Sequence, residues 1–123
     1  METMTSSVNK KFTPSQQAKF NRHKAIRTME KMMKNMYRMF RDETITLEQV
    51  SKRFFELKEQ LEDLGRVPLD TEYYREMRKY IEKLSSTLMT QVDIDTIRGT
   101  NMTQLNRIQK IKNKTDYKRE KRL

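Results

Sequence analysis

The chain has 123 residues, a net charge of +10, no cysteine, two glycines and two prolines. These numbers exclude disulfides and thiolate metal sites, and the hydrophobic share of 34% permits one modest domain with a small core. Because turn-forming residues are so few, we expect few and long elements, and the predicted fold class is all-α, a small helical bundle. No stretch reaches the length of a membrane span, and the N-terminus lacks a signal-peptide core, so we expect a soluble, intracellular protein.

Residues 1–12 show no periodicity and are expected to form a flexible terminus. Thr13 followed by Pro14 is typical of a helix start, and the predicted first helix covers residues 14–41. Its apolar residues recur every three or four positions: Ile26, Met29, Met33, Met36 and Phe40. A cationic row, offset by about 200° on a helical wheel, consists of Lys24, Arg27, Lys31, Lys34, Arg38 and Arg41. The pattern predicts an amphipathic helix whose basic face can contact phosphates.

This first helix is also unusually rich in methionine. Its methionines can fill an imprecise core, or they can form an adaptable surface for a protein partner. Met32 and Met39 lie off the apolar stripe, so they are the candidates for such a protein interface.

A second helix is predicted over residues 47–64. Thr46 and Gln49 match a capping box, and Gly65 marks the C-terminal stop. After Pro68, a third helix is predicted over residues 71–89, capped by Asp70 or Thr71. The two helices should form a central antiparallel hairpin.

Beyond residue 90, a short helix or turn should end at Gly99, and a last helix is predicted over residues 102–112. This outline fits either a helix-turn-helix or an ordinary bundle helix. In the first case, the candidate nucleic-acid contacts would be Arg98, Thr103, Gln104, Asn106 and Arg107. In either case, the helical domain should span residues 13–112, with a basic tail over residues 113–123. The basic residues of this C-terminal segment are Lys110, Lys112, Lys114, Lys118, Arg119, Lys121 and Arg122.

No arrangement of residues indicates catalysis. The chain has a single histidine, His23, which stands among cations and is expected to be a surface residue. We therefore predict a non-enzymatic protein without a metal or cofactor and without a small-molecule substrate.

One segment resembles a known family. Leu64-Gly65-Arg66-Val67-Pro68, followed by Glu72-Tyr73 and later by Thr96-Ile97-Arg98-Gly99 ahead of Leu105, is similar to the small helical DNA-binding repeat found beside homing endonucleases. The similarity covers residues 54–111, and it implies DNA binding without nuclease activity. The chain departs from the family pattern at Asn101 and Met102, where an aromatic residue is expected.

Charge is distributed unevenly along the chain. Residues 1–41 carry a net +8, residues 42–97 a net −5, and residues 98–123 a net +7. Basic ends favour a nucleic-acid partner, double-stranded DNA over RNA, bound through phosphates. A phage or mobile-element accessory protein would fit, located in the cytoplasm, on the nucleoid, in an infected cell or in a virion. The alternative is an assembly or adaptor protein that binds a partner through its Met-rich helix and self-associates through the hairpin.

Overall fold

The computed structural model describes residues 13–114, which form four helices and no strand. The helices are α2 (Pro14–Arg41), α3 (Leu47–Glu62), α4 (Glu72–Leu88) and α5 (Ile94–Lys114). The predicted all-α bundle is confirmed, and three of the four helices lie where the apolar spacing placed them. No helix in the described range has the length and apolar character that a membrane span requires.

The starts of the first three helices are fixed by threonine side chains. Thr13 caps α2 and Thr46 caps α3, and each forms the full capping box with the glutamine three residues later. In both boxes the threonine hydroxyl accepts from the glutamine N–H at 3.1 Å, while the threonine N–H donates to the glutamine side chain at 3.0 Å. Thr71 caps α4 by accepting from the N–H of Tyr74. These caps satisfy backbone donors that a helix start would otherwise leave unpaired.

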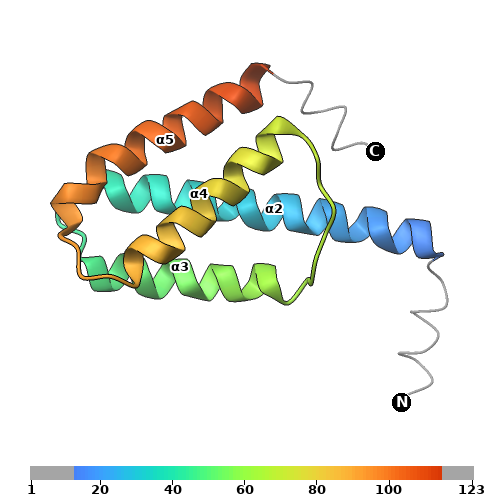
Figure 1. Cartoon of the computed structure of the whole chain (residues 1–123), viewed down its shortest axis with the longest axis horizontal. Helices are drawn as coiled ribbons and strands as arrows, with labels where there is room; N and C mark the ends of the chain where they lie inside the picture. The colour runs from blue at the N-terminus through green and yellow to red at the C-terminus, as the bar shows by residue number, and fades with distance from the viewer. Residues whose placement is uncertain (1–12, 115–123) are drawn as a thin grey trace, which may run out of the picture.

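Helix α2 is the central element of the bundle (Figure 1). Helices α3 and α5 lie along its two sides, and α4 crosses it diagonally. Arg53 on α3 donates to the side chain of Asn35 on α2, and Tyr73 on α4 donates to Glu30. The pair α2 and α5 is antiparallel, because Arg98 near the start of α5 contacts the end of α2, whereas Lys112 contacts Glu30. Helices α3, α4 and α5 therefore all pack against α2.

The expected hairpin of α3 and α4 is splayed rather than closely paired. The two helices run in opposite senses, but α4 crosses at a steep angle and α3 packs mainly on α2 (Figure 1). The connecting segment turns at Gly65, which has a φ of 71°, and it is held to α4 by a bond from Arg78 to the carbonyl of Val67. The apolar seam of α3, with Val50, Phe54 and Leu57 buried, is used within the chain.

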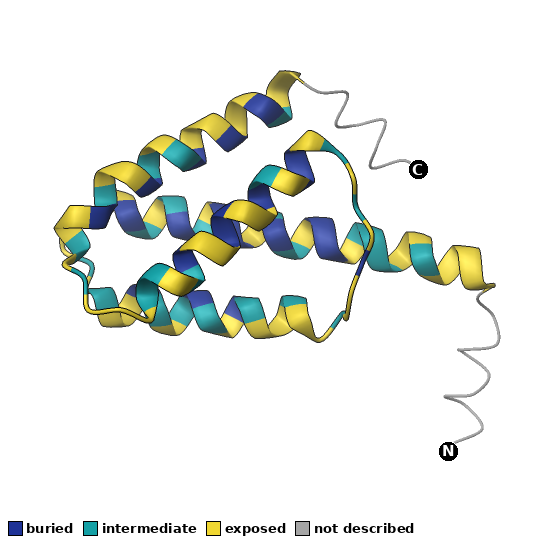
Figure 2. Ribbon diagram, in the orientation of Figure 1, coloured by how far each residue is buried: buried dark blue, intermediate teal, exposed yellow. Residues whose placement is uncertain are grey.

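The methionines of α2 form much of the core (Figure 2). Met29, Met32 and Met36 are all 0% exposed. The prediction that Met32 faces a protein partner is therefore wrong. Because α2 contacts helices on several sides, its buried face is wider than the stripe that a single helix pair would need. Met39, the other candidate, is half-buried and packs against the same core.

The last helix also differs from its prediction. Helix α5 begins at Ile94 and continues through Gly99 without a turn, so residues 94–108 do not form a helix-turn-helix. The alternative of an ordinary bundle helix is confirmed. Asn101 sits on the buried stripe between Ile97 and Leu105, and its side-chain N–H donates to the carbonyl of Ile97 at 2.8 Å. That local bond satisfies a polar group at a core position and lets the helix continue.

Candidate nucleic-acid interface

The six predicted cations of α2 all lie on its exposed face. At 1.5 Å per residue, the seventeen steps from Lys24 to Arg41 span about 25 Å. The opposite face carries the buried residues Ile26, Met29 and Phe40, so the two rows separate as predicted. We call this set the cationic row: Lys24, Arg27, Lys31, Lys34, Arg38 and Arg41.

The cationic row has no acidic partner among residues 13–114. None of the ion pairs formed between described residues includes one of its six members. Two of its members contact rings on the same helix: Lys24 lies 5.9 Å from the Phe20 centroid, and Arg41 lies 5.8 Å from the Tyr37 centroid. Such contacts leave the N–H donors of both cations able to bind an anion.

The cations of α5 are placed differently. Arg107 pairs with Glu76 at 3.5 Å, and Lys112, only 24% exposed, pairs with Glu30 at 3.5 Å. Lys110 and Lys114 are exposed, and no ion pair within the described range involves them. Four further candidates, Lys118, Arg119, Lys121 and Arg122, lie outside the described residues, as does the predicted N-terminal segment 1–12.

Arg98 has a structural role that sequence reasoning did not anticipate. Its side chain is 18% exposed, and its guanidinium donates to the carbonyls of Phe40 and Asp42 and lies 3.5 Å from Asp95. It therefore satisfies carbonyls at the C-terminal end of α2. The pKa of the Asp42 carboxyl is lowered by hydrogen bonds from the side chain and then the backbone of Thr44, with a smaller contribution from Arg98. Arg98 is thus already engaged within the fold.

The polar residues proposed to read base edges lie in the middle of α5 and divide between two faces. Gln104 and Arg107 line a hollow next to Glu76, Lys79 and Lys83 of α4, whereas Asn106 lies next to α2. Thr103 is exposed. No helix start presents these side chains together, so the major-groove geometry of a helix-turn-helix is absent from the described fold.

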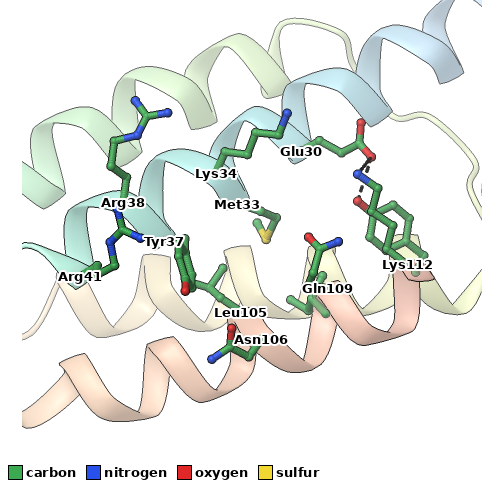
Figure 3. A pocket seen from close by; sticks show the side chains of 12 residues that line it. Glu30, Met33, Lys34, Tyr37, Arg38, Arg41, Leu105, Asn106, Gln109 and Lys112 are labelled. Atoms are coloured by element: carbon green, nitrogen blue, oxygen red, sulfur yellow. Dashed lines mark hydrogen bonds and ion pairs between the residues drawn. The ribbon is translucent and has the colours of Figure 1, made fainter. Parts of the chain in front are cut away.

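A cavity of about 370 Å³ lies between α2 and α5, with Tyr73 of α4 contributing to its wall (Figure 3). Lys34, Arg38 and Arg41 of the cationic row line it from α2. Asn106 and Gln109 line it from α5. We call this cavity the α2/α5 groove. The sequence contains no signal for it, because the pairing of α2 with α5 follows from packing rather than from any local pattern.

Comparison of the chain with protein-family models, with curated proteins and with solved structures found no match. The resemblance of residues 54–111 to the DNA-binding repeat of homing endonucleases stays a prediction. Its expected break between two helices at Gly99 is not found, since α5 is continuous there.

Proposed function

We propose that the protein binds nucleic acid through phosphate contacts made by the cationic row, with double-stranded DNA favoured over RNA. The observation that carries the proposal is the row itself: six exposed cations on one helix, unpaired with any acid among residues 13–114. Like charges on one helix repel one another, and a row of phosphates removes that cost. Contacts of this kind supply affinity without reading sequence.

Exposed basic residues at the end of α5 supply further positive charge for phosphate contacts. Lys110 and Lys114 are exposed near the C-terminal end of the described range, and α5 lies beside α2 (Figure 1). The basic residues that follow in the sequence continue this charge. The adaptor alternative would need a surface other than the Met-rich face, because Met29, Met32 and Met36 are buried.

The salt dependence of duplex binding tests the proposal. If the protein neutralises about six phosphates, the logarithm of the binding constant should fall with the logarithm of salt concentration with a slope of about −5. The variant Lys24→Gln, Arg27→Gln, Lys31→Gln should bind more weakly and reduce the magnitude of that slope by about 2.7, since about 0.9 is lost with each contact. Fluorescence anisotropy of a labelled duplex at several salt concentrations measures both quantities.

A matched control removes the same charge elsewhere. Lys52, Arg66 and Lys83 are exposed cations outside the row, and the triple change of these residues to Gln lowers the net charge equally. It should leave the slope nearly unchanged. Equal losses in both triple variants would show that only overall charge matters, and the absence of duplex binding at low salt would reject the proposal. Structured RNA of similar length, titrated in parallel, separates DNA from RNA as the preferred partner.

A further inference from the structure

The α2/α5 groove has features that phosphate tracking along a duplex does not use. Part of its surface is apolar: Met33, Leu105 and Ile108 are largely or fully buried and line it together with the half-buried ring of Tyr37. A volume of about 370 Å³ lies within the range of small-molecule sites. The groove can therefore accept a compact ligand with an apolar or aromatic body.

The rim of the groove is positively charged. Lys34, Arg38 and Arg41 line it from α2, and no described acidic side chain pairs with them. The groove has one acidic lining residue, Glu30, and its carboxylate already has partners within the fold. Lys112 lies 3.5 Å from it, and the hydroxyl of Tyr73 donates to it at 2.9 Å (Figure 3). The ligand that suits this rim is an anion.

The α5 wall adds two carboxamides. Asn106 and Gln109 are three residues apart and therefore share one face of the helix. Gln109 extends from α5 into the space below Met33 (Figure 3). Its N–H donates to Asn113 at 3.2 Å, which leaves its carbonyl oxygen as an acceptor. Each carboxamide combines a donor and an acceptor, as the edges of nucleobases do.

We infer that the α2/α5 groove binds one unpaired nucleotide. The base would contact the ring of Tyr37 and the apolar surface, Asn106 and Gln109 would hydrogen-bond its edge, and Lys34, Arg38 and Arg41 would hold the phosphates. A base inside a duplex is stacked and paired, so entering the groove would cost a few kcal/mol of unstacking. Among DNA ligands, the groove should therefore add affinity for single strands, ends or loops, whereas an intact duplex would be held by the cationic row alone. This inference rests on the proposed function, because the same row supplies the phosphate contacts.

Two kinds of ligand share this chemistry: a free nucleoside monophosphate, and a nucleotide within a strand. The experiment compares a labelled 12-nucleotide single strand, the corresponding 12-base-pair duplex and a free nucleoside monophosphate. Fluorescence anisotropy measures binding of the two polymers, and amide chemical shifts measure binding of the mononucleotide. We expect the single strand to bind about tenfold more tightly than the duplex at the same salt concentration, as one stacked base would supply.

Variants test the groove directly. Tyr37→Leu keeps an apolar side chain but removes the ring, and it should weaken single-strand binding by about tenfold while duplex binding changes little. Phe55→Leu is its control, because Phe55 is also a half-buried aromatic residue but lies on α3, outside the groove. Gln109→Ala should weaken single-strand binding several-fold. Its control is Gln60→Ala, at an exposed glutamine of α3. Because Gln109 is itself exposed, this second variant tests the groove without disturbing the core.

The outcomes separate this inference from the proposed function. Duplex binding with the expected salt slope, but with no preference for the single strand and no effect of Tyr37→Leu or Gln109→Ala, would overturn the groove site alone. Shifts at residues 34–41 and 105–109 on adding the mononucleotide, without binding of either polymer, would support the groove and reject the proposed function. If neither polymer nor mononucleotide binds, both are wrong.

Discussion

The hydroxyl of Tyr80 is buried on α4 without a hydrogen-bond partner in the described part of the chain. Burial raises the pKa of this phenol well above its ordinary value, because the ionised form would lose its hydration. In the unfolded chain the same phenol ionises near pH 10. The free energy of unfolding therefore keeps its full value below that pH. It falls as the pH rises further, because only the unfolded chain releases the proton.

Tyr80→Phe should make the protein less sensitive to alkaline pH. Near neutral pH the variant should be as stable as the parent or slightly more stable, because it removes a buried hydroxyl that has no partner. Above about pH 10, the parent should lose about 1.4 kcal/mol more per pH unit than the variant. Urea unfolding of both proteins at pH 8 and pH 11 measures this difference in stability. The titration of lysines is the same in both proteins and therefore cancels. An identical pH dependence in both proteins would show that this hydroxyl is hydrated.

The two glycines show, at the scale of an element, how the same residue type can end one helix and lie inside another. Gly65 has a φ of 71°, a conformation that side-chain-bearing residues rarely adopt, and it follows the end of α3. Gly99 lies within α5, where an added Cβ would meet nothing within 4 Å. Only the first of them needs to be glycine.

Substitution by alanine should therefore have opposite effects at the two sites. Gly99→Ala should raise the free energy of unfolding by about 0.5–1 kcal/mol, because alanine favours the helix and restricts the unfolded chain. Gly65→Ala should lower it by about 1–2 kcal/mol, because of strain at positive φ. Denaturant unfolding of the two variants measures both changes. Destabilisation by Gly99→Ala would indicate a break in α5 that the structure does not show.

The contrast between these glycines also explains which elements could be predicted from the sequence. The caps at Thr13, Thr46 and Thr71 are local, since donor and acceptor lie within three residues, and all three starts were expected. The continuity of α5 was not expected, because Gly99 is typical of a helix end and Asn101 interrupts the apolar stripe. Only the bond from Asn101 to Ile97 and the packing against α2 reveal one helix.

The candidate site likewise has some features that the sequence predicts and others that it does not. The cationic row follows from a 3,4 spacing on one helix, so its exposure was predictable, as was the opposite apolar face. The burial of Met32 was not predictable, because it depends on how many helices surround α2. The α2/α5 groove and the engagement of Arg98 join residues far apart in the chain, and no local pattern encodes them.

At the scale of the whole molecule, Arg98 connects the first described helix to the last. Its guanidinium donates to two backbone carbonyls at the end of α2, those of Phe40 and Asp42. Arg75 donates to both the side chain and the carbonyl of Asp70, but its side chain is 52% exposed and these bonds lie at the surface. Partly buried bonds from a charged donor contribute more than exposed ion pairs do.

Arg98→Ala should destabilise the protein by about 1.5–3 kcal/mol, because it leaves the Phe40 carbonyl without its donor. The Asp42 carbonyl loses the bond from Arg98 but keeps its bond from the N–H of Ile45. Arg75→Ala, the matched control, should cost less than about 1 kcal/mol. Thermal and urea unfolding followed by circular dichroism measure both values. Equal effects at the two positions would mean that water replaces Arg98 at these carbonyls without a net cost.

The position of α5 beside α2 has a consequence for the order of folding. The side-chain bond between α2 and α3 joins residues 18 apart in the chain, whereas Arg98 reaches a carbonyl 58 residues away. Closing the longer loop costs more chain entropy, so we expect α2 and α3 to pair early and α5 to dock late. The groove then exists only on the completed chain. Newly made or partly unfolded molecules would display the cationic row but not the groove, so they could hold phosphates before they could hold a base.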